Sequence, residues 1–185
     1  NSTRRRQRQM CIRDRFKGSL INTINDSSTR PMMSKAREGI FNILQNDFNN
    51  STVLDLYAGS GSLGIESLSR GADFVTFIEL STKCSKIIEK NLSNMEVNFT
   101  VLVTKVINYI SQSNEQFDII FYDPPFSTSK TEIDNELNII QNLMNKNSKL
   151  VIHRHKSSDQ FVYPNGLELY REKNYGQSRI TILKK

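Results

Sequence analysis

The feature that most constrains the fold is a regular alternation, beginning at residue 53, of short apolar runs with segments of helical periodicity. The apolar runs are rich in Val, Ile, Phe and Tyr and are mostly continuous, which is typical of strands buried on both faces. The runs that predict strands are Val53–Tyr57, Phe74–Glu79, Phe99–Thr104, Phe117–Tyr122 and Lys149–His155. One helical stripe between them consists of Cys84, Ile87, Ile88, Leu92 and Met95. The alternation predicts an α/β fold, a mostly parallel sheet with helices on both of its faces.

Both ends of the chain depart from this alternation. Leu167–Tyr175 and Ser178–Leu183 predict two strands joined at Gly176-Gln177, an antiparallel hairpin that closes the sheet. Upstream, residues 16–31 predict a short strand and a loop, and a helical stripe then follows at Met33, Ala36, Ile40, Phe41, Leu44 and Phe48. We therefore expect an N-terminal extension over residues 16–50 and one main domain over residues 51–185.

The positive charge is concentrated at the N-terminus. Residues 1–15 hold six arginines and one acid, which supply five of the six net positive charges of the chain. The string Met10-Cys11-Ile12-Arg13-Asp14-Arg15 resembles the translated read-through of a sequencing adapter, so we expect residues 1–15 to be a non-native or disordered basic tail. The basic composition is then weak evidence for a nucleic-acid partner.

The composition also indicates in which cellular compartment the protein is expected. No run reaches the roughly 18 consecutive apolar residues of a membrane span, and the start of the chain lacks the apolar segment of a secretory signal. The two cysteines are too few for a disulfide scaffold. We expect a soluble, cytoplasmic protein.

A glycine loop after the first predicted strand indicates a nucleotide-like ligand. Gly59, Gly61 and Gly64 match the pattern G-x-G-x-x-G where a strand leads into a helix, so that backbone N–H groups can approach a ligand. Glu79 lies at about the 20-residue spacing expected of a ribose-binding acid. The loop alone fits a nicotinamide dinucleotide as well as other adenosine-containing cofactors. Asp55 favours a ligand with an ammonium group, because its carboxylate would repel a pyrophosphate.

The fourth predicted strand ends in Asp123-Pro124-Pro125-Phe126. Two consecutive prolines cannot donate hydrogen bonds to a sheet, so the strand has to stop there. Ligands of open parallel sheets bind at the carboxyl ends of the strands. If the first and fourth strands are neighbours, this segment brings a carboxylate, free carbonyls and an aromatic ring beside the glycine loop.

Together these residues resemble the S-adenosylmethionine-dependent amino-methyltransferases, whose signature is Asp or Asn, two prolines and Tyr, Phe or Trp after an aliphatic strand. Further segments are similar to the RsmD-type 16S rRNA guanine-N2 methyltransferases: Arg30-Pro31, Lys35–Glu38, Phe41–Leu44, Leu56–Ala72, Arg171–Lys173 and Gly176-Gln177. The resemblance covers residues 16–185. It implies a Rossmann-like methyltransferase fold, S-adenosylmethionine as cofactor, and small-subunit rRNA in an assembling or assembled ribosomal subunit as substrate.

The resemblance also implies roles for individual residues. Asp123 and the Pro124 carbonyl would accept the hydrogens of the target amine, and Phe126, after Pro125, would stack on a base taken out of its own stack. The cofactor residues would be Asp55, Tyr57, Gly59, Ser60, Gly61, Gly64, Glu79 and Leu80. The candidate phosphate contacts are the basic residues Arg30, Lys35, Arg37, Arg154 and Lys156.

Some positions depart from the family pattern, and some alternatives stay open. Ser81 stands where relatives often have Asp and is predicted as a helix N-cap, and Thr104-Lys105 replaces an acid near the adenine. His153 and His155 predict a solvated strand end, since two ligands do not close a zinc site, and no metal is expected. We expect a monomer. The alternatives are a DNA adenine-N6 or cytosine-N4 methyltransferase, an NAD-dependent dehydrogenase, and an RNA-binding module with a decayed catalytic site.

Overall fold

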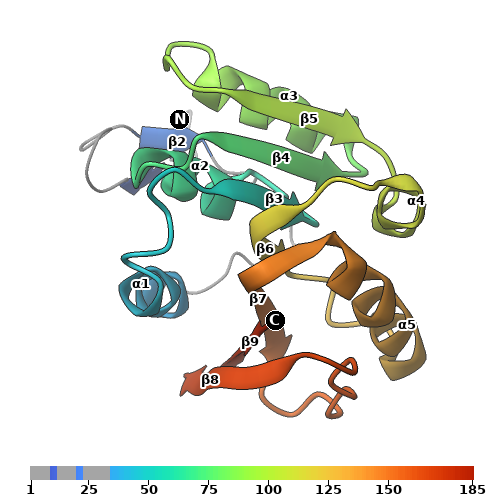
Figure 1. Ribbon diagram of the computed structural model, residues 1–185. Coiled ribbons are helices and arrows are strands. Elements are labelled where there is room, and N and C mark those ends of the chain that lie inside the picture. The colour runs from blue at the N-terminus through green and yellow to red at the C-terminus, as the bar shows by residue number, and fades with distance from the viewer. Residues whose placement is uncertain (1–8, 12–19, 23–33) are drawn as a thin grey trace, which may run out of the picture.

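The computed structural model describes residues 9–11, 20–22 and 34–185 and contains a seven-stranded sheet in the order β5-β4-β3-β6-β7-β9-β8 (Figure 1). The strands from β5 to β7 run parallel, and β9 is antiparallel to both β7 and β8. The strands are β3 (Thr52–Leu56), β4 (Phe74–Glu79), β5 (Phe99–Val103), β6 (Phe117–Tyr122), β7 (Met144–His155), β8 (Glu168–Tyr175) and β9 (Ser178–Lys184). The predicted mostly parallel sheet with a C-terminal antiparallel hairpin is confirmed.

Helices cover both faces of this sheet (Figure 1). The helices are α1 (Ser34–Ile43), α2 (Ser62–Ser69), α3 (Thr82–Leu92), α4 (Val106–Gln112), α5 (Lys130–Ile140) and a 3₁₀ turn, η2 (Gln141–Leu143). Side chains alternate along a strand, so Ile119 and Phe121 of β6 point to one face while Ile120 and Tyr122 point to the other. The sheet therefore separates two hydrophobic cores, one under α1, α2 and α3 and one under α4 and α5.

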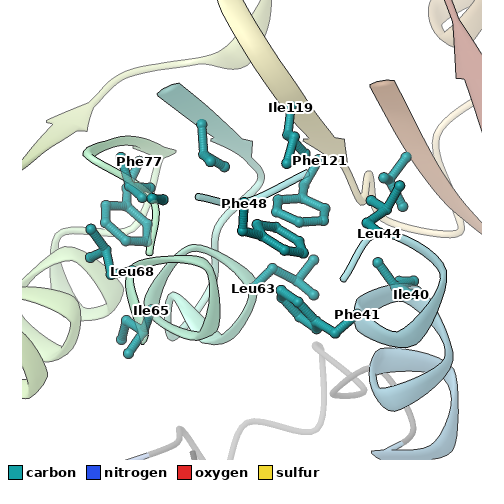
Figure 2. Packing of buried hydrophobic residues seen from close by; sticks show 14 of the residues in the cluster. Ile40, Phe41, Leu44, Phe48, Leu63, Ile65, Leu68, Phe77, Ile119 and Phe121 are labelled. Atoms are coloured by element: carbon teal, nitrogen blue, oxygen red, sulfur yellow. The ribbon is translucent and has the colours of Figure 1, made fainter. Parts of the chain in front are cut away.

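The first core is built around aromatic rings (Figure 2). The rings of Phe41 from α1 and Phe48 from the following turn have their centroids 4.9 Å apart, and Phe121 of β6 lies 6.0 Å from Phe41. The predicted helical stripe extends past the end of the helix. α1 ends at Ile43, and Leu44 and Phe48 in the following turn are also buried in this core. Met33, the first residue of that stripe, lies outside the described residues.

The predicted bounds of β4 and β6 agree with the structure, but the start of β7 does not. We expected a strand from Lys149, whereas β7 begins at Met144, which pairs with Phe117 of β6. The register shifts after this pair, and the Ser148 hydroxyl donates to the Phe117 carbonyl at 2.7 Å. The polar residues between Met144 and Lys149 therefore belong to the start of β7, and the predicted strand start at Lys149 was wrong.

A separate two-stranded ribbon lies near the N-terminus. β1 (Gln9–Cys11) pairs antiparallel with β2 (Leu20–Asn22). β1 lies within the expected tail, and β2 lies within the segment predicted to contain a short strand. The other residues of segments 1–15 and 16–31 lie outside the described residues. That residues 1–15 are non-native or disordered stays a prediction.

Candidate active site

Three strand ends meet at the carboxyl edge of the sheet. β3 lies between β4 and β6, and both neighbours pair with it in parallel. The glycine loop follows β3, Glu79 is the last residue of β4, and Asp123 directly follows β6. The predicted neighbourhood of the glycine loop and the Asp-Pro-Pro-Phe segment is confirmed.

The glycine loop turns through backbone conformations that favour glycine. Gly59 and Gly61 have φ of 58° and 78°, and Tyr57 shares this left-handed region with φ of 60°. A Cβ at Gly64 would lie 2.2 Å from the Phe77 ring, so Gly64 is required for the close packing of α2 on β4. In the described part of the chain no atom lies within 4 Å of a Cβ built on Gly59. Gly59 is therefore the glycine that leaves space for a ligand, while Gly64 serves packing.

Two carboxylates accept hydrogen bonds from backbone N–H groups of the glycine loop and of the start of α2. Asp55 is 2% exposed, and its Oδ2 accepts a hydrogen bond from the Gly64 N–H at 2.9 Å. Glu79 accepts from the Gly59 N–H at 2.7 Å and from the Ser81 N–H at 2.8 Å. The Ser81 hydroxyl in turn accepts from the Cys84 N–H at 3.3 Å, which confirms Ser81 as the N-cap of α3.

The site has a negative electrostatic character. Burial raises the pKa of the Asp55 carboxyl well above its usual value, the Gly64 hydrogen bond opposes the shift, and the charges of Asp123 and Glu79 add to it. Three acidic side chains, Asp55, Asp123 and Glu79, therefore act on one another at this edge of the sheet, and a cation between them would be attracted. This field suits a ligand with positive groups and disfavours a pyrophosphate.

The Asp-Pro-Pro-Phe segment is held open toward solvent. The Asp123 side chain is 28% exposed and Phe126 is 42% exposed. The Phe126 ring meets the rings of His153 and His155 edge-on, at centroid distances of 5.5 and 5.8 Å. An exposed carboxylate beside an exposed aromatic face can receive a polar, planar group.

Arg154 of β7 fastens this segment from the inside. Its side chain is buried, and its guanidinium nitrogens donate to the carbonyls of Pro124, Pro125, Phe126 and Thr128 at 2.8–3.3 Å. Prolines at a strand end leave carbonyls without a sheet partner, and buried carbonyls need donors. The predicted phosphate contact for Arg154 is therefore wrong, because its donors are directed at the protein's own backbone.

His153 is also buried, contrary to the predicted solvated strand end. It is 3% exposed, and its Nδ1 lies 2.8 Å from Oδ1 of Asp123. Its Nε2 lies 2.9 Å from the hydroxyl of Ser178 at the start of β9. The imidazole points inward because both of its nitrogens find partners there. His155 stays at the partly exposed end, where its Nδ1 contacts Ser157.

Comparison with known proteins now assigns a family. Residues 11–184 match the family described as "Conserved hypothetical protein 95". The chain belongs to this family. A relative from Buchnera aphidicola, named ribosomal RNA small subunit methyltransferase D, is 32% identical over 88% of this chain and 85% of its own length. The resemblance inferred from the motifs is confirmed.

Solved structures agree with the family assignment. The structure of the candidate methyltransferase yhhF from Escherichia coli superposes with a TM-score of 0.84 and 26% identity, covering 96% of this chain and 98% of that one. Magnesium protoporphyrin IX methyltransferase from Synechocystis, solved with S-adenosylmethionine, has a TM-score of 0.65 at 14% identity over 82% of this chain and 78% of that one. The second likeness shows the fold alone, which is that of S-adenosylmethionine-dependent methyltransferases.

The structure adds a carboxylate that we did not predict for this family member. Glu136 of α5 is buried and accepts hydrogen bonds from the hydroxyls of Tyr122, at 2.7 Å, and Tyr57, at 2.9 and 3.0 Å. Burial raises the pKa of Glu136, although both hydrogen bonds lower it. Helical spacing carried the signal, because Glu136 lies on the apolar stripe of α5 between Ile133 and Ile140.

The remaining predicted residues are placed as follows. Leu80 is 63% exposed directly after Glu79, and Ser60 is partly exposed within the glycine loop. Lys35 and Lys156 are exposed, Arg37 is partly exposed, and Arg30 lies outside the described residues. Within the described residues, no group of three or more His, Cys, Asp or Glu side chains is arranged to hold a metal ion. Over the same residues, no helix is long and apolar enough to cross a membrane.

Proposed function

We propose that this chain transfers a methyl group from S-adenosylmethionine to the exocyclic N2 amine of a guanine in small-subunit rRNA. The observation that carries the proposal is the position of Asp123, an accessible carboxylate one residue beyond β6 and adjacent to the glycine loop of β3. The relatives named ribosomal RNA small subunit methyltransferase D support rRNA as the substrate. The guanine N2 atom follows from the resemblance of the motifs.

The cofactor assignment is supported by the donors and charges around the glycine loop. Gly59 leaves room for a ligand, Glu79 stands where ribose hydroxyls would be bound, and the charges of Glu79 and Asp123 act on the buried Asp55 carboxyl beside the loop. S-Adenosylmethionine carries an ammonium and a sulfonium, so this field favours it over NAD. When bound, the cofactor would supply an electrophilic methyl carbon, and the electron pair of its bond to sulfur would stay on sulfur. The amine nitrogen would bond to this carbon and release one of its two hydrogens as a proton.

The protein's own residues would prepare the amine. The lone pair of an exocyclic amine is conjugated with its ring and is a poor nucleophile. Asp123 would accept one of its hydrogens and the Pro124 carbonyl, which already accepts from Arg154 at 3.3 Å, would accept the other with its second lone pair. These two contacts would draw the nitrogen toward a tetrahedral shape. Phe126 would stack on the extruded guanine, a contact worth about 1–3 kcal/mol per base. Fixed alignment of reacting groups can supply roughly 7–11 kcal/mol of the barrier.

The wider substrate is part of the same proposal. The exposed Lys35 and Lys156 are the candidate phosphate contacts that the structure leaves facing outward, together with the partly exposed Arg37. We propose that the protein acts as a monomer in the cytoplasm on rRNA within an assembling or assembled small subunit.

The test is transfer of tritium from labelled S-adenosylmethionine to small subunits isolated from cells that lack the enzyme. Nucleoside analysis should find the label in N2-methylguanosine. Label in N6-methyladenosine would overturn the guanine assignment, and label in duplex DNA but not in subunits would favour the DNA methyltransferase alternative. Titration calorimetry is the check on the cofactor: saturable binding of NAD, with none of S-adenosylmethionine, would contradict the assignment.

A further inference from the structure

A hydrogen-bonded chain crosses three strands behind the proposed reacting carboxylate. It runs from Oδ1 of Asp123, after β6, to Nδ1 of His153 on β7 at 2.8 Å. It continues from Nε2 of His153 to the Ser178 hydroxyl at the start of β9, at 2.9 Å. His153 and Ser178 are buried, whereas the Asp123 side chain is 28% exposed. Only the Asp123 end of this series of hydrogen bonds is therefore open to solvent.

The chemistry of the two ends fixes the roles of the imidazole nitrogens. An ionised carboxylate can only accept, so Nδ1 of His153 carries a hydrogen and donates it to Asp123. In the neutral imidazole Nε2 is then an acceptor, and the Ser178 hydroxyl can donate to it. A buried imidazole cannot exchange these partners for water. The tautomer is therefore set by Asp123, which can only accept, and the Ser178 hydroxyl, which can donate or accept, matches it on the other side of the ring.

The neighbouring contacts limit the freedom of the imidazole and leave Asp123 as its acceptor. The Phe126 ring packs edge-on against the imidazole, and β7 is paired on both sides, with β6 and with β9. Asp123 itself lies beyond the last paired residue of β6, so the sheet does not fix its side chain. His153 supplies the restraint that the sheet does not.

We propose that His153 is a positioning residue for methyl transfer: it holds Oδ1 of Asp123 so that Oδ2 is directed at the target amine, and Ser178 holds the opposite side of the imidazole through its contact with Nε2. This inference rests on the proposed function, since it assigns a partner to the carboxylate that acts on the amine. His153 touches neither cofactor nor substrate in this role. Its loss should lower the rate of the chemical step and leave cofactor affinity unchanged.

Two substitutions separate the two hydrogen bonds of the imidazole. In His153→Asn, the amide nitrogen takes the place of Nδ1 and can still donate to Asp123, while the contact with Ser178 is lost. In His153→Gln, the amide nitrogen takes the place of Nε2 and stays near Ser178, while the donor to Asp123 is lost. Both variants remove the ring, so they share the packing defect and differ in the donor to Asp123.

The experiment measures kcat, KM for the small subunit, affinity for S-adenosylmethionine and Tm of the two variants. His153→Gln should lose about 10- to 100-fold in kcat, the range seen when a supporting partner of an active group is removed. His153→Asn should retain most of the wild-type rate, and Ser178→Ala should fall between the two. Cofactor affinity should match the wild type in every case. His155→Gln, the same change two residues along β7, is the control and should retain the wild-type rate.

Each other outcome has a definite meaning. Equal losses of kcat in His153→Asn and His153→Gln, or no loss in either, would overturn the positioning role. A loss of cofactor affinity or of Tm that parallels kcat would assign His153 to folding and would equally overturn it. Failure of the proposed function is distinguishable, because the wild-type protein itself would then place no label in N2-methylguanosine.

Discussion

The two halves of the proposed site are held in different ways. The glycine loop is fixed by residues close to it in the chain: Asp55 binds the N–H of Gly64, nine residues on, and Glu79 binds that of Gly59, 20 residues back. The Asp-Pro-Pro-Phe segment is fixed by Arg154 and His153, which lie 26–30 residues from the groups they bind and on another strand.

This difference separates binding from chemistry. Substitutions in β3, α2 or β4 alter the loop that would hold the cofactor, whereas substitutions in β7 alter the loop that would act on the amine. Glu136 links the halves, because it accepts hydrogen bonds from Tyr57 in the glycine loop and from Tyr122 at the end of β6. The comparison therefore predicts separable effects on cofactor affinity and rate, with Glu136 affecting both loops.

The largest expected effect is on the rate. Asp123→Ala should lower kcat and kcat/KM together by about 10²–10³-fold, the scale on which a contact to a reacting centre acts. Its affinity for S-adenosylmethionine should change much less. Asp55→Ala is the matched change in the other half and should weaken cofactor binding by about 1.5–3 kcal/mol. Initial rates and calorimetry on both variants measure the split; an unimpaired rate in Asp123→Ala would contradict the mechanism.

The contrast also explains what could be predicted from the sequence. Asp55, Gly59, Gly61 and Glu79 belong to one local pattern of a strand, a turn, a helix and the next strand, whose spacing alone places them together. The mostly parallel sheet was predictable from the alternation of strands and helices, whereas the neighbourhood of β3 and β6 was only a condition of the prediction. The role of Arg154 was not, since a basic residue in His-Arg-His-Lys is typical of a solvated strand end. Its inward direction follows from the unpaired carbonyls of the two prolines, which become visible only when β6 and β7 are placed side by side.

Substitutions of Arg154 and Lys156 test whether the inward-pointing Arg154 side chain stabilises the protein. Arg154→Met keeps an apolar stem but removes every donor to the carbonyls of Pro124, Pro125, Phe126 and Thr128. Its free energy of unfolding should fall by about 1.5–3 kcal/mol, as for a lost charge-assisted hydrogen bond. Lys156→Met, two residues along, should leave stability unchanged and lower rRNA affinity in a salt-dependent way. Urea unfolding and filter binding provide the measurements. Equal stability of the two variants would contradict a stabilising role for the Arg154 hydrogen bonds.

In the glycine loop, substitutions of Gly64 and Gly59 should likewise separate an effect on stability from an effect on ligand binding. Gly64→Ala places a methyl group against the Phe77 ring and the Val75 side chain, so overpacking should cost about 1–3 kcal/mol of stability. Gly59→Ala meets no described atom within 4 Å, and its left-handed φ should cost roughly 1–2 kcal/mol. The added methyl group at Gly59 should also weaken cofactor binding, because it occupies the space left for the ligand. Thermal melting with and without S-adenosylmethionine separates the two effects: a normal ligand-induced rise in Tm for Gly59→Ala would argue against its role.

The smallest expected effect is a pH dependence at Glu136, the residue that joins the halves. Burial raises the pKa of its carboxyl above the usual 4.5, so the folded protein holds this proton more tightly than the unfolded chain does. The resulting stabilisation is present below pH 4.5 and is lost as the pH rises through the folded-state pKa. Glu136→Gln cannot ionise and keeps an oxygen that accepts from the tyrosines. The wild type should therefore lose stability relative to this variant as the pH rises from 4.5.

Glu132, one turn earlier on α5, supplies a control of opposite sign. Its carboxylate accepts from the Ser129 hydroxyl and N–H in a capping box, and these hydrogen bonds lower its pKa from 4.5. Its stabilisation is present above the usual pKa and is lost as the pH falls through the lowered one. Relative to Glu132→Gln, the wild type should thus gain stability as the pH rises from the lowered pKa of Glu132 to 4.5, below the range in which Glu136 acts. Urea unfolding at a series of pH values measures both differences. Slopes of the same sign for the two variants would show that Glu136 is not stabilised in its protonated form, and would remove it as the buried link between the glycine loop and β6.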